Sequence, residues 1–267
     1  MKIMMISPKH GRGLTTVSAL LADMCARELS IPCILSQTDP LDGSLNKYLD
    51  LSRGMDKTMS IRQISKLLEV GEISGNDIKD YTVKRGKLGI FDIYDNTVLR
   101  SQEDVDLNIK LLNKVLSDTS KSIAFIDVAD EIYEEEVSSL IDDADYFMLV
   151  IDQSTVTTDQ LLAIQETDYW KKFKERDFLV IVNNFNKNIS SLDVIAKKLG
   201  IRRSKILKIG YNPLIVKQAN DGTLLYVNDF GLDEDFRYID ITNDLLDCVD
   251  TIAKNLAIAY KRKKVRR

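Results

Sequence analysis

The sequence predicts an α/β fold, a mostly parallel twisted β-sheet with helices on both of its faces. Its apolar runs are short and nearly continuous, which is typical of strands that are buried on both faces of a sheet. Stretches with helical spacing of apolar residues separate these runs, and strands that alternate with helices indicate a parallel sheet. A glycine-rich turn follows the first run, at the end of a strand where such sheets bind ligands.

Apolar runs along the whole chain are predicted to form the strands. They cover residues 2–7, 32–37, 121–128, 144–152, 177–184 and 204–212. Residues 15–29 form a predicted helix after the first run, because apolar side chains recur there at helical spacing. Further helices are predicted over residues 134–141, 159–173 and 243–260. We expect right-handed crossovers between the parallel strands.

Residues 52–103 are less regular than the rest of the chain. They contain a helical pattern at 60–73 and a strand-like run that ends in a turn at 86–96. No stretch rich in Gly, Pro or Ser divides the sequence, and no internal repeat is visible. We therefore predict a single domain over residues 1–260, followed by a basic tail over residues 261–267.

The composition is that of a protein that buries a large core. Of the 267 residues, 44% are hydrophobic and 29% are charged, and the formal net charge is −4. This negative charge gives no support to a protein that coats nucleic acid over its whole surface. No apolar run reaches the length of a membrane span, and the first residues do not resemble a signal peptide. The 3 cysteines suit neither a disulfide framework nor a zinc site, so we expect a cytoplasmic protein.

Positive charge is concentrated at the C-terminus, where residues 261–267 read KRKKVRR. Runs of like charge are usually solvated, so a frayed tail is one interpretation. The other is a weak attraction of Lys261 to Arg267 for DNA or for anionic lipid. Both interpretations stay open at this point.

The glycine-rich turn has the features of a phosphate-binding loop. It reads SPKHGRGLTT over residues 7–16 and lies between a predicted strand and a predicted helix. Main-chain N–H groups in such a turn point inward, and the helix N-terminus adds a partial positive charge. Gly11 and Gly13 allow the main chain to pass close to phosphate oxygens. The hydroxyl of Thr15 is placed to contact a magnesium ion.

Segments further along the chain extend this pattern. They read TDPLDGSL at 38–45, IAFIDVAD at 123–130, IVNN at 181–184 and IGYNPLIVKQANDGTLLY at 209–226. Together with the loop, in this order and spacing, they resemble the ParA/MinD family of P-loop ATPases (the SIMIBI class) over about residues 2–226. The resemblance implies a P-loop NTPase fold of the deviant Walker A type. It also implies ATP and Mg²⁺ as ligands and a nucleotide-dependent homodimer.

The resemblance implies a role for each matching residue. Lys9 corresponds to a signature lysine that reaches across the dimer, and Asp39 corresponds to the aspartate that orients the attacking water. Thr15 would bind magnesium directly and Asp127 would bind it through a water molecule, while Asn183 would read the adenine edge. The residues that the resemblance places at the nucleotide are Lys9, Gly11, Arg12, Gly13, Leu14, Thr15, Thr16, Asn183, Tyr211 and Pro213.

Simpler interpretations exist for several of these residues. Asp39 precedes a proline, and Asp-Pro pairs favour turns. Asn183 is followed by a second asparagine, and both also suit a turn. His10 is the only histidine and reads most simply as a surface loop residue, because nothing near it in the sequence looks like a catalytic partner.

The loop departs from the family pattern at positions close to the phosphates. Leu14 stands where the family has the lysine that neutralises the β and γ phosphates. His10 replaces the first glycine of the loop, Gln37 replaces the first aspartate of an Asp-x-Asp-Pro pattern, and Gly210 replaces a usual proline. Loss of one preorganised charge at such a site costs about a hundred- to a thousandfold in rate. We therefore expect nucleotide binding with weak or absent hydrolysis.

The sequence supports three functions in descending order. The first is an ATP-binding, dimerising factor that positions or assembles a secretion, pilus or conjugation apparatus, and that resembles localisation proteins of Tad-type pili. Its partners would be a second copy of the chain and an unidentified protein of a membrane-associated machine. It would work in the cytoplasm or at the inner face of the membrane. The second function is an active partition ATPase of the ParA/MinD kind, and the third is a structural protein that has lost the nucleotide.

Overall fold

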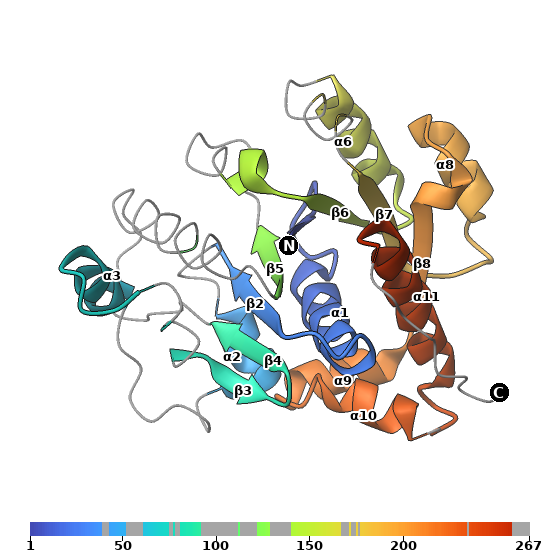
Figure 1. Ribbon diagram of the computed structural model, residues 1–267. Coiled ribbons are helices and arrows are strands. Elements are labelled where there is room, and N and C mark those ends of the chain that lie inside the picture. Colours follow the sequence, from blue (N-terminus) through green and yellow to red (C-terminus); the bar gives the residue numbers. More distant parts are fainter. Residues whose placement is uncertain are drawn as a thin grey trace.

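The apolar runs of the sequence form one β-sheet. The computed structural model describes residues 1–38, 43–51, 61–74, 77, 81–91, 112, 122–128, 140–166, 171, 175, 177–233 and 235–257. Within these residues the sheet has eight strands in the order β3-β4-β2-β5-β1-β6-β7-β8 (Figure 1). Asp39, most of the 134–141 helix and the basic tail lie outside the described residues.

The strands follow the predicted runs closely. Their bounds are β1 Lys2–Ile6, β2 Cys33–Gln37, β3 Val83–Arg85, β4 Leu88–Phe91, β5 Ile123–Val128, β6 Tyr146–Ile151, β7 Phe178–Phe185 and β8 Ile206–Gly210. All neighbouring strands are parallel except β3 and β4, which pair antiparallel. The mostly parallel sheet is confirmed, and β3 is an edge strand that the apolar pattern does not reveal, because it reads only VKR.

Helices connect the strands and begin at recognisable signals. Their bounds are α1 Leu14–Glu28, α2 Ser44–Leu49, α3 Ile61–Glu69, α6 Thr155–Gln165, α8 Leu192–Leu199, α9 Pro213–Asn220, α10 Tyr226–Leu232 and α11 Ile239–Asn255, with a 3₁₀ turn η3 at Arg203–Lys205. α6 begins four residues before the predicted position, since the Ser154 hydroxyl accepts a hydrogen bond from the Thr157 N–H at 3.2 Å. α11 also begins four residues early, directly after a turn at 236–238.

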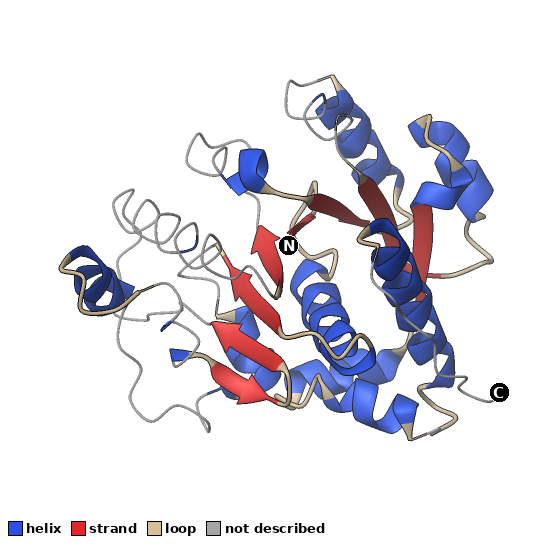
Figure 2. Ribbon diagram, viewed as in Figure 1, coloured by secondary structure: helices blue, strands red, loops and turns tan. Residues whose placement is uncertain are grey.

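The sheet divides the core into two layers. Alternate side chains of β1 point to opposite faces, so Ile3 and Met5 belong to one hydrophobic cluster while Met4 and Ile6 belong to the other. Helices α1, α10 and α11 contribute to the first cluster, and α3, α6 and α8 contribute to the second. Figure 2 shows the strands running between these two sets of helices. No helix in the described part of the chain is long and apolar enough to cross a membrane.

The chain changes direction across the sheet at β1. From β1 it passes through α1 to β2, on the side of the sheet that holds β5, β2 and β4. From β5 it later passes to β6, on the other side of β1, and continues outward to β7 and β8. Ligands of open parallel sheets bind at such a switch point, beyond the carboxyl ends of the strands. The loop after β1 lies at this point.

Candidate functional site

Residues 7–13 connect β1 to α1, and two glycines shape their path. Gly11 has φ of 77° and Gly13 has φ of 78°, both in the left-handed region. A side chain in that region costs roughly 1–2 kcal/mol, so glycine is the natural residue at both positions. Gly13 is also the N-cap of α1, and its carbonyl accepts the first helical hydrogen bond, from the Val17 N–H at 2.9 Å.

Side chains hold the carbonyl groups of the loop. The Ser7 hydroxyl donates to the Lys9 carbonyl at 2.9 Å, and the Asn183 amide donates to the Arg12 carbonyl at 2.8 Å. No side chain caps α1 at Gly13, and the first turn of α1 contains no acidic residue. The positive end of the helix is therefore available to an anion.

A cavity of about 210 Å³ opens above this helix end. Its described lining residues are Ser7, Lys9, His10, Gly11, Gly13, Leu14, Thr15, Thr16, Ser44, Tyr48 and Asp127. Lys9 is its one lysine and Asp127 its one carboxylate among these residues. The remaining polar groups are mostly hydroxyls, which donate to or accept from a phosphate without adding charge.

Asp127 reaches the cavity from the neighbouring strand β5. The register of the sheet places Asp127 beside Met5, two residues before the loop begins at Ser7. Asp127 is only 3% exposed, although its side chain is a carboxylate. Gln37 lies level with it on β2. Thr15 and Asp127 thus line one cavity, and a hydroxyl and a carboxylate are the hard oxygen donors that Mg²⁺ takes. This donor set fits magnesium.

Two residues of α2 complete the cavity wall and were not predicted from the sequence. The Ser44 hydroxyl donates to the Thr15 hydroxyl at 3.3 Å, and Tyr48 lies one turn further along the same helix. They are part of the site because α2 packs against α1, and a local sequence pattern does not predict such a tertiary contact. Ser44 belongs to the segment TDPLDGSL that carries the family resemblance, and Tyr48 follows it at the four-residue spacing of one helix face.

Leu14 occupies the position where a lysine would be expected. Its side chain lines the cavity and also packs against the hydrophobic cluster under α1. A leucine has no donor for a phosphate oxygen, so the loop contributes main-chain amides and the hydroxyls of Thr15 and Thr16 there. The cation closest in sequence that faces the same cavity is Lys9.

Arg12 is not among the described residues that line the cavity, although Gly11 and Gly13 on either side of it are. Its guanidinium forms an ion pair with Asp152, which follows β6, and both side chains are 20% exposed. Burial raises the pKa of Asp152, but hydrogen bonds from Ser154 and Thr157 and the charge of Arg12 outweigh it, so the pKa lies below the ordinary value. Sequence reasoning missed Asp152, because nothing in the sequence links it to the loop.

The residues expected at the base lie at the ends of β7 and β8. Asn183 is brought to the loop, where its amide bonds the Arg12 carbonyl. Tyr211 is 62% exposed, and its N–H donates to the Phe185 carbonyl at 3.1 Å. Pro213 is the first residue of α9. Asn183, Tyr211 and Pro213 are not among the described residues that line the cavity at the loop.

A mostly parallel sheet whose first strand leads through a glycine-rich loop into a helix is the arrangement of the P-loop NTPases. Comparison with solved structures is more specific, because the chain has the fold of the MinD and ParA ATPases. No protein-family model and no curated protein sequence matches the chain.

Three of the similar structures illustrate the extent of the match. The MinD cell division protein of Aquifex aeolicus is 18% identical, with 100% of this chain and 99% of that chain covered and a TM-score of 0.67. A ParA family ATPase from Chlorobium tepidum TLS is 15% identical, with 93% and 96% covered and a TM-score of 0.67. The septum site-determining protein MinD of Pyrococcus horikoshii OT3, complexed with Mg-ADP, is 14% identical, with 94% and 96% covered and a TM-score of 0.68. At these identities the similarity shows the fold.

Proposed function

We propose that the protein binds ATP with Mg²⁺ at the loop after β1, that the bound nucleotide promotes a homodimer, and that hydrolysis is weak or absent. The observation that carries this proposal is the composition of one cavity. It combines the open N-terminus of α1 and the Thr15 and Asp127 oxygens with a leucine at position 14. The MinD structure of Pyrococcus horikoshii holds Mg-ADP in the same fold.

Different groups of the cavity would serve nucleotide binding and hydrolysis. Main-chain amides of Gly11 to Thr15 and the positive end of α1 would hold the phosphates in the ground state. Bound magnesium would neutralise charge on the phosphate oxygens. A lysine at position 14 would add a cation where charge develops in the transition state, and Leu14 does not. We therefore expect the loss at Leu14 to fall on the rate more than on affinity.

Lys9 is the residue that would link binding to dimerisation. It lines the cavity, and the resemblance to the ParA/MinD family implies that its counterpart acts across the dimer. The second partner would be a protein of a membrane-associated secretion, pilus or conjugation apparatus, which the dimer would position or help to assemble. Asp39 would orient water in any residual hydrolysis, and Asn183, Tyr211 and Pro213 would border the base.

The test is calorimetric titration with Mg-ATP and Mg-ADP, combined with the molecular mass in solution with and without each nucleotide. We expect binding of ATP, a shift to twice the monomer mass, and little release of phosphate. Lys9→Ala should bind nucleotide and remain a monomer. A chain that binds no ATP at millimolar concentration, or a Lys9→Ala variant that dimerises normally, contradicts the proposal.

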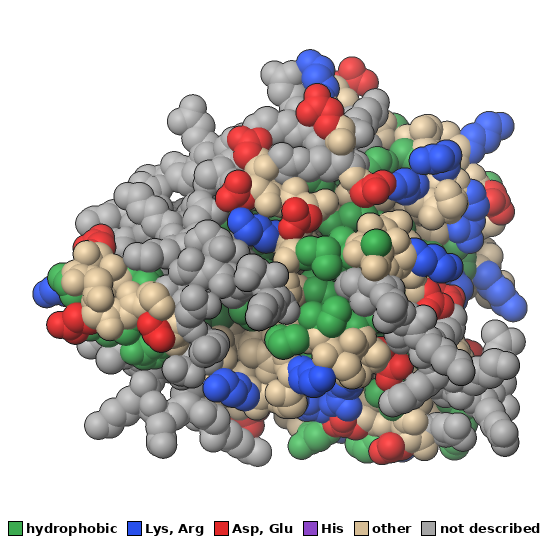
Figure 3. Space-filling model, in the orientation of Figure 1, with side chains coloured by type: hydrophobic (Ala, Val, Ile, Leu, Met, Phe, Trp, Pro, Cys, Tyr) green, Lys and Arg blue, Asp and Glu red, His purple; other side chains and the backbone are tan. Residues whose placement is uncertain are grey.

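A second candidate function is supported by the charge at one edge of the sheet. Between residues 187 and 208 the chain has a single carboxylate, Asp193, among seven cations. Figure 3 shows Lys and Arg side chains gathered on the side of the molecule that carries α8 and β8. The cations are Lys187, Lys197, Lys198, Arg202, Arg203, Lys205 and Lys208. This basic edge suits an active partition-type ATPase that binds DNA.

DNA distinguishes the two candidates. Lys187, Lys197 and Arg202 form no ion pair among the described residues, whereas Lys198, Lys205 and Lys208 pair with carboxylates. An active partition ATPase would release phosphate faster on duplex DNA, and the triple substitution of the unpaired residues with Ser would abolish this stimulation. Turnover that does not respond to DNA at low salt leaves the first proposal in place.

A further inference from the structure

The side chain of Arg12 forms an ion pair with Asp152 and does not line the cavity above α1. Residues 9–11 and 13–16 all line the cavity, and Arg12 does not. Its side chain instead reaches Asp152, directly after β6. A cation in a phosphate-binding loop that avoids the phosphate cavity needs an explanation other than direct binding.

Asp152 is held in place independently of Arg12. Its Oδ1 accepts the Ser154 N–H at 3.0 Å and the Ser154 hydroxyl at 2.7 Å. The same hydroxyl contacts Thr157 in the first turn of α6 at 2.9 Å. These bonds leave Oδ2 for Arg12. Asp152 is therefore a fixed acceptor that joins the loop to the start of α6.

Arg12 is restrained at its main chain as well. Its carbonyl accepts the Asn183 amide at 2.8 Å, from the end of β7. The residues on either side, Gly11 and Gly13, are glycines with positive φ, which are the least restricted residues of a chain. Without the Arg12 side chain, the Asn183 bond to the Arg12 carbonyl would be the one side-chain restraint among the described residues on the two peptide units between these glycines. Their amides must point inward if the loop is to hold a phosphate.

Leu14 makes this external restraint necessary. A lysine at position 14 would place its donors inside the loop, whereas the leucine side chain packs against the core under α1. The loop is consequently held by residues outside it. Asp152, after β6, pairs with the Arg12 side chain, and Asn183, near the end of β7, donates to the Arg12 carbonyl.

We propose that Arg12 is a positioning residue: its ion pair with Asp152 holds the amides of the loop in the phosphate-binding arrangement and joins that arrangement to the first turn of α6. Arg12 does not contact the nucleotide. The consequence for affinity rests on the proposed function, whereas the effect on the loop itself does not.

The first measurement is hydrogen exchange of the peptides that cover residues 7–16, in the protein without nucleotide. Arg12→Met and Asp152→Asn should each speed exchange in these peptides by about tenfold, the effect of losing one hydrogen bond to a charged group. Arg12→Lys keeps an ion pair and should restore most of the protection. Lys198→Met, which breaks the ion pair with Asp159 between α8 and α6, is the matched control and should leave the loop unchanged. Unchanged exchange in Arg12→Met overturns the proposal whether or not the protein binds ATP.

The second measurement separates positioning from direct contact. If Arg12 positions the loop, Arg12→Met and Asp152→Asn both weaken Mg-ATP and Mg-ADP by similar factors, and the double variant is no weaker than Arg12→Met. If Arg12 instead contacts the terminal phosphate, Asp152→Asn frees it and tightens ATP while ADP is unaffected. Tighter ATP binding by Asp152→Asn therefore overturns the proposal. Failure of the wild-type chain to bind nucleotide refutes the proposed function and leaves the exchange result to judge Arg12.

Discussion

Leu14 is the residue on which the balance between binding and hydrolysis depends. Its side chain faces the cavity and also packs against the core. We predict that Leu14→Lys increases phosphate release by at least about tenfold, because it returns a cation to the place where charge develops. The lysine stem can follow the path of the leucine while its ammonium reaches the cavity, so the stability cost should stay near 1 kcal/mol.

The control for this substitution is Leu14→Met, which keeps the volume and adds no charge. It should leave both the urea midpoint and phosphate release close to those of the wild type, since such exchanges are usually tolerated. Equal phosphate release by the Lys and Met variants would mean that the cavity lacks another catalytic group. The altered residue Gln37 beside Asp127 would then be the next candidate.

The two loop glycines give a second prediction with an internal control. A Cβ at Gly13 would lie 2.3 Å from Asn183 Nδ2, whereas a Cβ at Gly11 would meet no atom within 4 Å. Both positions have similar positive φ, so both alanine variants carry the same backbone strain of roughly 1–2 kcal/mol. We predict that Gly13→Ala destabilises the protein by about 1–3 kcal/mol more than Gly11→Ala, because it also displaces a buried amide from the Arg12 carbonyl. Urea unfolding of the two variants measures the difference, and equal losses would refute the steric explanation.

Whether a site residue could be predicted from the sequence depends on whether it belongs to a local motif or is brought to the site by tertiary packing. Gly11, Gly13 and Thr15 lie in one continuous stretch, and Asp127 ends an apolar strand, so local patterns identify all of them. Asp152 and Ser44 reach the loop from a neighbouring strand end and from α2. Their partners are fixed by strand order and helix packing, which a single sequence does not encode locally. For Arg12 the motif identifies the position but not the direction of its side chain.

At the scale of elements, β8 and α11 meet at a buried carboxylate. Asp244 of α11 accepts the Gly210 N–H at 2.8 Å and pairs with Lys208. Burial raises the pKa of Asp244, and the hydrogen bonds from Lys208 and Gly210 offset this in part. Gly210 stands where the ParA/MinD pattern has proline, and a proline has no N–H to donate. The glycine and the aspartate therefore form a matched pair.

We predict that Gly210→Pro destabilises the protein by about 1–3 kcal/mol, since it leaves the buried acceptor without its donor. In an Asp244→Ala background the same substitution should cost much less, because the acceptor is gone. A double-mutant cycle from urea unfolding measures the coupling. If Gly210→Pro costs the same in both backgrounds, the penalty comes from backbone strain, and the matched pair is an incorrect interpretation.

The elements themselves were predictable to the extent that they are buried. Near-continuous apolar runs located β1, β2 and β5 to β8, because a strand covered on both faces excludes polar residues. β3 was not predicted, since it is an edge strand of three residues whose central lysine is exposed. α6 and α11 began earlier than their apolar patterns suggested, because their first turns are set by capping and by a preceding turn. The apolar pattern thus predicts which segments are buried, whereas the ends of helices and strands depend on local hydrogen bonds.

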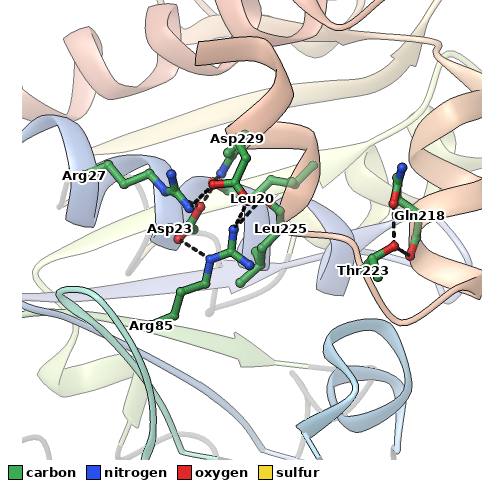
Figure 4. A network of polar contacts seen from close by, with 9 residues as sticks. Leu20, Asp23, Arg27, Arg85, Gln218, Thr223, Leu225 and Asp229 are labelled. Atoms are coloured by element: carbon green, nitrogen blue, oxygen red, sulfur yellow. Dashed lines mark hydrogen bonds and ion pairs between the residues drawn. The ribbon is translucent and has the colours of Figure 1, made fainter. Parts of the chain in front are cut away.

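At the scale of the whole molecule, a network of charges joins segments that are far apart in the chain. Asp23 of α1 is buried and contacts Arg27 Nε at 2.8 Å, Arg85 Nε of β3 at 3.6 Å and the Asn228 amide of α10 at 2.9 Å. Asp229 of α10 pairs with both arginines (Figure 4). The edge strand β3 is therefore tied to the helix that starts at the loop. Two carboxylates balance two guanidinium groups, so the network carries no net charge.

Burial raises the pKa of Asp23, and the hydrogen bond from Asn228 and the charges of Arg27 and Arg85 only partly offset it. A carboxyl whose pKa is raised on folding contributes stability that is present below its unfolded pKa and is lost as pH rises through its folded pKa.

We predict that the difference in unfolding free energy between the wild type and Asp23→Asn is largest near pH 4 and shrinks towards pH 7. Asp152→Asn is the control for this pH dependence, because the pKa of Asp152 is lowered and its contribution is lost as pH falls through the ordinary carboxyl range. Its difference from the wild type should stay constant between about pH 5 and pH 7 and decrease at lower pH, the opposite of the trend for Asp23→Asn. Urea unfolding across that range measures both, and a difference for Asp23→Asn that grows with pH would mean that the two arginines, rather than burial, dominate the charge state of the network.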